Sequence, residues 1–284
     1  MKKNILFSFL ILAICNNAFA FDHKHTIYDK LLQKHVVENR VDYKSFLIDQ
    51  NILQEYIQSF SKITTEEYKE WSRNEKLSFW INAYNALTIA SILECYPIDS
   101  KICSSRWFNR MFYPNNSIQQ IKNIWEKRFS ISTSRLSLSE IEHEILRSSS
   151  RFSKEIPEHF RHTFHEPRIH FAINCGAVSC PRLYSRAYTS KNLERTLENQ
   201  IKYFLSQRKN FRIREDIEQV KLSKIFSWFQ EDFLYLEKKV PKQQQILSYI
   251  YAHWENPSVS KNDFLQYRIE YREYDWELND IEAK

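Results

Sequence analysis

The sequence predicts an α+β fold: a mostly helical single domain with a small, largely antiparallel sheet. Most segments with clear periodicity repeat their apolar residues every three to four positions, as helices do, and only a few alternate apolar and polar residues, as strands do. Runs of helices with a few scattered strands are typical of α+β proteins. No internal repeat or low-complexity linker divides the chain, so residues 21–284 are expected to form one domain.

The helical period predicts seven helices. They are His25–His35, Lys44–Phe60, Asn74–Glu94, Ser137–Arg147, Ser190–Gln207, Ile225–Phe233 and Gln243–Trp254. The longest, Asn74–Glu94, is apolar around most of its circumference, which is usual for a helix at the centre of a fold. Ser137 and Glu140 have the spacing of a capping box and mark a helix start.

Three segments predict strands. Arg168–Asn174 is a short apolar run that indicates a buried strand. Phe211–Leu222 predicts a hairpin with its turn near Glu215 and Asp216. Leu265–Tyr271 alternates apolar and polar residues, which predicts a strand with one buried face.

The first twenty residues are predicted to be a signal peptide. Lys2 and Lys3 precede the apolar run Ile5–Ile14, and Ala18-Phe19-Ala20 supplies a cleavage pattern of small residues. We therefore expect an exported protein, periplasmic or secreted; lipid attachment at Cys15 and an uncleaved anchor are the alternatives. No later segment is long and apolar enough for stable membrane insertion.

The charge of the chain is mildly basic. The formal net charge is +6, and removal of residues 1–20 with their two lysines leaves +4. Because the charge forms no stripe and no nucleic-acid motif is present, no nucleic-acid partner is expected. The expected partner is a small-molecule or peptide substrate of unknown identity, and no cofactor is predicted.

The chain contains a single glycine, Gly176. A position that keeps glycine where all others have lost it is expected to need a positive φ or a bare backbone for close packing. Gly176 lies between Cys175 and Cys180, directly after the predicted strand. Cys95 and Cys103 complete the mature cysteines; local pairing of each neighbouring couple is the simplest of three connectivities, which the sequence leaves open.

Several motifs resemble the domain of unknown function 547 family, which is found in bacteria and plants. They are Phe79–Ala86, Ser137–His143, Arg168–Ala177, Ser179–Pro181, Lys224–Trp228 and Tyr274–Trp276. The resemblance extends from about Leu31 to Trp276 and identifies the chain as an exported bacterial member. It implies one continuous domain with a shared site around the Asn-Cys-Gly segment, and it implies no established reaction.

Cys175 is the first candidate for a catalytic nucleophile. A cysteine that ends a strand before a glycine turn exposes its sulfur, and the N–H groups of Gly176 and Ala177 can stabilise an oxyanion. His143, on the capped helix, is the preferred base. His170 is expected to point away, because residues 170 and 175 face opposite sides of a strand.

Two buried amides complete the predicted catalytic set. Asn82 or Asn85 orients the imidazole or donates to the oxyanion; alternatively, both amides only hold neighbouring backbone groups. Arg168 and Arg182 are candidates to bind a substrate carboxylate as bidentate forks, with ordinary surface salt bridges as the alternative. The predicted substrate-binding set is Arg168, Arg182, His170, Ser179 and Cys180.

The same cysteines support other interpretations. Cys180 is a second candidate nucleophile. The segment Cys175–Cys180 is similar to the Cys-Gly-Ser-Cys of papain-like peptidases, in which the second cysteine reacts, but it is two residues longer. A Cys175–Cys180 disulfide, structural or redox-active, is the alternative. His159, His162 and His165 bring three further metal-ligand side chains nearby, but no paired Cys-x-x-Cys or His-Glu-x-x-His spacing appears, so a solvated histidine-rich loop is favoured and no metal is predicted.

These observations give two functional hypotheses. The leading one is a cysteine-dependent hydrolase or acyl transferase that acts on a peptide- or amide-like substrate. The alternative is a non-catalytic periplasmic binding or interaction domain with a structural Cys175–Cys180 disulfide. The state of the two thiols separates them.

Overall fold

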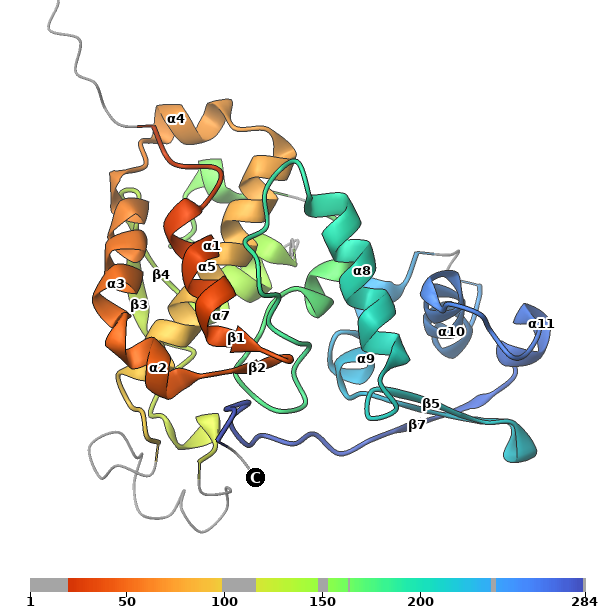
Figure 1. Ribbon diagram of the computed structural model, residues 1–284. Coiled ribbons are helices and arrows are strands. Elements are labelled where there is room, and N and C mark those ends of the chain that lie inside the picture. Colours follow the sequence, from red (N-terminus) through yellow and green to blue (C-terminus); the bar gives the residue numbers. More distant parts are fainter. Residues whose placement is uncertain (1–19, 99–115, 148–152, 163, 236–238, 283–284) are drawn as a thin grey trace, which may run out of the picture.

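The computed structural model describes residues 20–98, 116–147, 153–162, 164–235 and 239–282 (Figure 1). Its α-helices are α1 (Thr26–His35), α2 (Tyr43–Ile48), α3 (Gln50–Ser59), α4 (Thr65–Glu70), α5 (Arg73–Leu93), α7 (Leu138–Glu140), α8 (Leu193–Ser206), α9 (Ile225–Trp228), α10 (Lys242–His253) and α11 (Lys261–Phe264). Short helical turns are η1 (Phe60–Lys62), η2 (Ile118–Gln120), η4 (Glu158–Phe160), η5 (Pro167–Phe171), η6 (Glu215–Ile217) and η7 (Gln230–Phe233), and η3 (Ile141–Leu146) is a π-helix. The predicted α+β class is confirmed.

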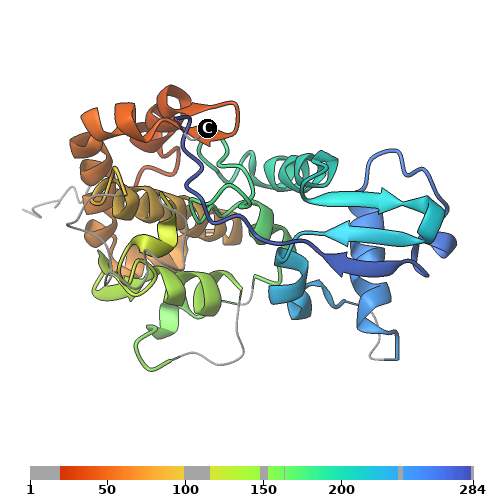
Figure 2. The same cartoon turned by 90° about the horizontal axis from the view of Figure 1, so that it is seen from below.

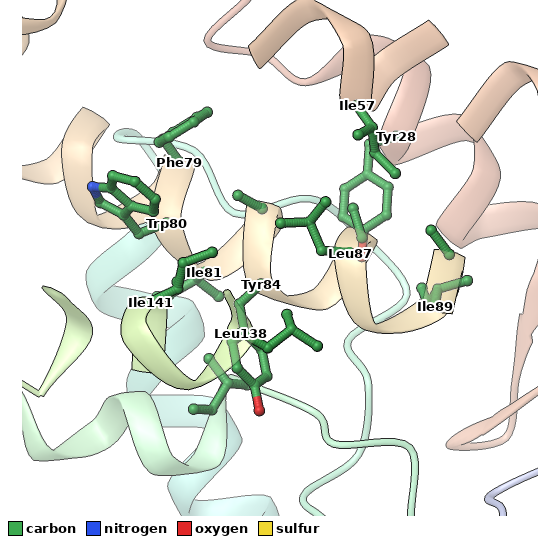
Figure 3. Packing of buried hydrophobic residues seen from close by; sticks show 14 of the residues in the cluster. Tyr28, Ile57, Phe79, Trp80, Ile81, Tyr84, Leu87, Ile89, Leu138 and Ile141 are labelled. Atoms are coloured by element: carbon green, nitrogen blue, oxygen red, sulfur yellow. The ribbon is translucent and has the colours of Figure 1, made fainter. Parts of the chain in front are cut away.

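Helix α5 lies at the centre of the N-terminal helices. Ser72 caps it: the hydroxyl accepts from the Glu75 amide, and the Glu75 carboxylate accepts from the Ser72 amide. Every residue from Leu77 to Leu93 is buried. Figure 3 shows its apolar side chains packed between Tyr28 and Ile57 on one side and Leu138 and Ile141 on the other. The prediction of a buried central helix is therefore confirmed.

The strands form three small sheets. Strands β1 (Val36–Val37) and β2 (Arg40–Val41) pair in an antiparallel hairpin, as do β3 (Arg128–Ile131) and β4 (Ser134–Ser137). The third sheet has the order β5-β6-β7, from β5 (Phe211–Arg214), β6 (Gln219–Leu222) and β7 (Arg268–Tyr271). Strand β6 is antiparallel to β5 and parallel to β7. The predicted hairpin and the final strand are confirmed, and the first two hairpins were not predicted.

The buried apolar residues form two clusters. One surrounds α5, and the other lies beneath the β5-β6-β7 sheet against α8, α9 and α10. In Figure 2 this sheet lies at one end of the molecule and the N-terminal helices at the other. After β7 the chain runs back to the N-terminal helices, where Ala177 pairs with Leu278 and Val41 with Asp280. This C-terminal strap, residues 272–280, therefore connects the two clusters.

The predicted strand Arg168–Asn174 is wrong. Residues Pro167–Phe171 form the 3₁₀ turn η5, with proline in its first turn and the Glu166 carboxylate accepting from the Arg168 amide. A short apolar run alone does not separate a buried strand from a buried helical turn. The predicted helix Lys44–Phe60 is also divided, because α2 ends at Ile48 and α3 begins at Gln50, with Asp49 between them. Among the described residues, no helix combines the length and apolar character that a bilayer crossing requires.

Candidate functional site

Gly176 fixes the backbone of the segment between the two cysteines. Its φ is +86°, a region that L side chains rarely adopt. A Cβ at this position would lie 2.6 Å from Ile92 Cδ1 on α5 and 3.3 Å from Ile118 Cγ2. Both reasons proposed for the glycine are therefore present: the backbone needs the positive φ, and the central helix packs directly against it.

Buried amides hold this segment against α5 and the C-terminal strap. Asn85 Oδ1 accepts from the Asn174 amide at 2.8 Å, and Asn85 Nδ2 donates to the Ala172 carbonyl at 3.0 Å. Asn174 Oδ1 accepts from the Gly176 amide at 2.9 Å and from Asn279 Nδ2 at 3.2 Å. Because these groups are buried and satisfied, they define one conformation of the loop.

Cys175 and Cys180 form a disulfide, with their Cα atoms 6.1 Å apart. The Tyr274 hydroxyl, from the C-terminal strap, lies 3.5 Å from Cys175 Sγ and donates to Cys180 Sγ at 3.2 Å. Burial and the nearby Glu142 raise the pKa of Tyr274 above its usual range, so this hydroxyl remains a donor. Cys95 is also disulfide-bonded, and its predicted partner, Cys103, lies outside the described residues.

A pocket of about 280 Å³ opens beside the disulfide. It is lined by Tyr84, Trp125, Glu126, Ser139, Glu142, His143, His170, Ile173, Cys175, Cys180, Pro181, Ile225, Trp228, Phe229, Tyr274 and Trp276. We call it the disulfide pocket. Its walls come from α5, the η3 region, the loop that carries both cysteines (residues 174–181, called the cysteine loop below), α9 and the C-terminal strap. Four predicted site residues therefore meet in one cavity: His143, His170, Cys175 and Cys180.

His170 belongs to a buried charged network. Its Nε2 donates to Asp232 Oδ2 at 2.7 Å, and Arg147 Nε donates to the same oxygen at 2.6 Å. The imidazole stacks on Phe229, with the ring centroids 4.3 Å apart. Burial lowers the pKa of His170 despite the carboxylate beside it. Burial acts to raise the pKa of Asp232, but the two hydrogen bonds hold it below its usual range.

The expectation that His170 points away from Cys175 is therefore wrong. Alternation between two faces applies to extended strands, whereas His170 lies in the helical turn η5, which ends before Cys175, and both residues line the disulfide pocket. His143, the preferred base, is exposed in the same pocket, and its Nδ1 accepts from Arg147 Nη1 at 3.0 Å. Since arginine only donates, Nδ1 is the acceptor in this contact.

Aromatic side chains cover one side of the disulfide pocket. Trp228 stacks on Trp276 with centroids 5.7 Å apart, and Tyr274 lies within 4.7 Å of both indole centroids. Trp228 is 45% exposed, which is unusual for so large an apolar side chain. Deeper in the pocket, the Tyr84 hydroxyl donates to Glu142 Oε2 at 2.7 Å.

The two predicted catalytic amides lie outside the pocket wall. Asn82 Oδ1 accepts from the Tyr188 amide at 3.0 Å, and Asn82 Nδ2 donates to the Tyr188 carbonyl at 2.7 Å. Asn85 likewise accepts from the Asn174 amide and donates to the Ala172 carbonyl. Both side chains hold backbone groups, which is the alternative role considered for them.

The other predicted binding residues are also placed elsewhere. Arg168 donates to Glu166 at 2.6 and 2.7 Å and to Glu194 at 2.7 Å, and these hydrogen bonds raise its pKa above the usual range. Ser179 Oγ accepts from the Asp275 amide at 2.9 Å and so anchors the C-terminal strap. Arg182 lines a separate cavity. Within the part of the chain that the structure describes, no group of three or more acidic, histidine or cysteine side chains is arranged to hold a metal ion.

Comparison with known families finds one match. Residues 68–205 match the family described as "Protein of unknown function, DUF547". The DUF547 region runs from α4 through α8 and contains the cysteine loop, α5 and both pocket histidines, which supports the resemblance noted from the motifs. No curated protein and no solved structure matches the chain.

Residues outside the DUF547 match also contribute to the site: Tyr274 and Trp276 line the disulfide pocket, and Asp232 accepts the hydrogen bond of the pocket residue His170. Tyr274 and Trp276 belong to one of the motifs that resemble the family, Tyr274–Trp276. Their place in that motif and their aromatic side chains were the sequence features that could have identified them as site residues. No sequence pattern identifies Asp232 as the partner of His170, because the two residues are 62 positions apart and meet only in the fold.

Proposed function

We propose that the protein is a binding domain that takes up a small molecule or peptide in the disulfide pocket. The observation that carries this proposal is the pairing of Cys175 with Cys180 at the wall of a partly apolar cavity. A disulfide leaves no thiolate for nucleophilic attack, whereas it fixes the shape of the pocket wall. Concave sites with aromatic walls and a few polar groups are the usual form of ligand-binding sites.

The chemistry of the lining favours a ligand with an amino group next to an aromatic or apolar part. Glu126 and Glu142 line the pocket, and no lysine or arginine does so among the described residues. The faces of Trp228 and Trp276 carry negative electrostatic potential, which attracts cations. A protonated amine can therefore meet both carboxylate and ring faces, whereas a carboxylate ligand would be repelled.

Paired ligands of opposite charge test this proposal. Tryptamine and indole-3-propionate share an indole, but one carries an ammonium and the other a carboxylate. We expect saturable binding of tryptamine to the oxidised protein by calorimetry, with at least tenfold weaker binding of indole-3-propionate. Glu142→Gln should weaken tryptamine binding, and Glu273→Gln, an exposed charge outside the lining, should not. Equal binding of both compounds, or of neither, would contradict the proposal.

A cysteine-dependent hydrolase or acyl transferase is the second candidate. The observation that favours it is the presence of Cys175 and the His170–Asp232 pair in one pocket. In this mechanism a dithiol reductant first reduces the Cys175–Cys180 disulfide. The reductant is oxidised to a disulfide, and both protein cysteines become thiols. His170 then removes the Cys175 proton, the thiolate attacks an amide carbonyl, and the histidine proton passes to the departing amine.

Alkylation of the reduced protein tests the second candidate. An activated thiolate predicts that Cys175 reacts with iodoacetamide rapidly at pH 6 after dithiothreitol treatment. His170→Ala should slow this reaction, and His143→Ala shows whether the exposed imidazole takes part instead. If Cys175 of the reduced, unsubstituted protein reacts no faster than an ordinary thiol of the unfolded chain, or if neither variant slows its reaction, the enzyme candidate fails.

Export is part of both candidates. The described residues contain two disulfide-bonded cysteines in the loop and a third, Cys95, and such bonds persist mainly in oxidising compartments. The predicted signal peptide falls almost wholly on residues 1–19, which lie outside the described ranges. Fractionation of expressing cells, with N-terminal sequencing of the exported protein, should give a mature start near Phe21. Retention of the full chain in the cytoplasm would contradict this.

A further inference from the structure

A second, smaller cavity lies next to the disulfide pocket. Its volume is about 140 Å³, and the two cavities share Cys180 and Pro181 in their walls. We call it the basic cavity, because Arg40, Arg182 and Lys209 line it and Glu38 is the one acidic residue in its described lining. Neutral amide side chains also line it: Asn39, Gln200, Gln207, Asn210 and Asn279.

Arg182 is held rigidly at the wall of this cavity. Its guanidinium stacks on the Tyr203 ring, 3.6 Å from the centroid, and its Nε donates to Gln200 Oε1 at 2.7 Å. A longer contact of 3.4 Å joins Nη1 to Asn39 Oδ1. All of these partners are neutral. A stacked guanidinium in one fixed orientation is well suited to bind an oxyanion with its remaining N–H groups.

Lys209 brings a second positive charge to the same cavity. Its ammonium donates to the Val178 carbonyl at 2.8 Å, which leaves further N–H donors. Among the described residues, neither Arg182 nor Lys209 forms an ion pair with a carboxylate. Partial burial and the charge of Arg40 lower the pKa of Lys209, while Asp275 acts in the opposite direction. Positive charge in this cavity is therefore only partly compensated.

We propose that the basic cavity binds one small oxyanion, a phosphate or carboxylate group, between Arg182 and Lys209. The volume admits a single anionic group, and the two cations offer donors of different kinds: a planar fork and a compact ammonium. The site is chemically opposite to the disulfide pocket, whose charged lining residues are acidic. It uses other side chains and does not depend on the function proposed for that pocket.

Calorimetry of the full mature protein with intact disulfides tests this site. Inorganic phosphate and acetate are titrated separately in a chloride buffer. We expect saturable 1:1 binding of at least one of them. Tighter phosphate binding identifies a phosphate group as the ligand, and tighter acetate binding identifies a carboxylate.

Three variants locate the binding. Arg182→Gln and Lys209→Gln should each weaken it at least tenfold. Arg208→Gln removes an exposed neighbouring charge that does not line the cavity, and should change it less than twofold. If Arg182→Gln does not fold, Lys209→Gln still gives the comparison with Arg208→Gln. Absence of saturable binding by both anions, or equal losses in the Lys209 and Arg208 variants, would overturn the proposal.

Discussion

The Tyr274 hydroxyl donates to Cys180 Sγ at 3.2 Å, although the two residues are 94 positions apart. This contact places the C-terminal strap on the disulfide. The strap is held on both sides of Tyr274, because the Val178 amide donates to the Glu277 carbonyl at 2.8 Å and the Asp275 amide donates to Ser179 Oγ at 2.9 Å. The disulfide pocket therefore depends on contacts between the cysteine loop and the C-terminal strap, which are far apart in the sequence.

Loss of the Tyr274 hydroxyl should reduce stability modestly. Tyr274→Phe keeps the aromatic packing and removes the hydrogen bond to sulfur, so we expect a loss of about 0.5–1.5 kcal/mol in the free energy of unfolding. Urea denaturation of the oxidised protein measures it. Tyr184→Phe is the control, because the Tyr184 hydroxyl has no hydrogen bond within the described residues. An equal loss of stability in both variants would show that the hydrogen bond to sulfur does not contribute.

Substitution of the single glycine should be strongly destabilising. Gly176→Ala imposes a side chain at φ +86° and places Cβ 2.6 Å from Ile92 Cδ1. Backbone strain and overpacking together are expected to cost about 2–4 kcal/mol in the free energy of unfolding. Ile92→Val removes the clashing methyl group, so the double variant should be more stable than the sum of the single effects predicts. Strict additivity would show that the contact with α5 is not the cause.

Asn82→Ala should affect stability and leave the disulfide pocket functional. The buried amide makes two hydrogen bonds to the Tyr188 backbone, and its removal leaves a buried N–H and carbonyl without partners. We expect a loss of about 2–4 kcal/mol in the free energy of unfolding. Tryptamine affinity of the folded fraction should be unchanged. A variant of normal stability with no binding would instead place Asn82 in the site.

Burial of His170 makes the stability depend on pH. Its pKa is lowered in the folded protein, so below the ordinary value of about 6.5 the unfolded chain binds a proton that the folded protein does not. The free energy of unfolding should therefore fall as the pH decreases through 6.5, by at most about 1.4 kcal/mol per pH unit for this group. Urea denaturation between pH 7 and 5 should show that the free energy of unfolding depends less steeply on pH in His170→Gln than in the native protein.

Much of the fold follows from local patterns. The apolar circumference of Asn74–Glu94 predicted the central helix, and the sole glycine marked the loop that packs against it. The strand predicted at Arg168–Asn174 failed because an apolar run of this length fits both a strand and a buried turn, and Pro167 decided between them. That error also led to His143 being preferred over His170 as the base, although His170 stayed in the predicted substrate-binding set. Its partner Asp232 depends on tertiary packing, which no local pattern records.

The redox state of the two loop cysteines in the native protein tests the central claim most directly. The exported protein is treated with iodoacetamide without reductant, digested, and examined by mass spectrometry for the peptides that contain Cys175 and Cys180. The binding-domain account predicts that neither cysteine is alkylated and that their segment carries an intact disulfide. Rapid alkylation of Cys175 without reductant would contradict it and favour the thiol enzyme.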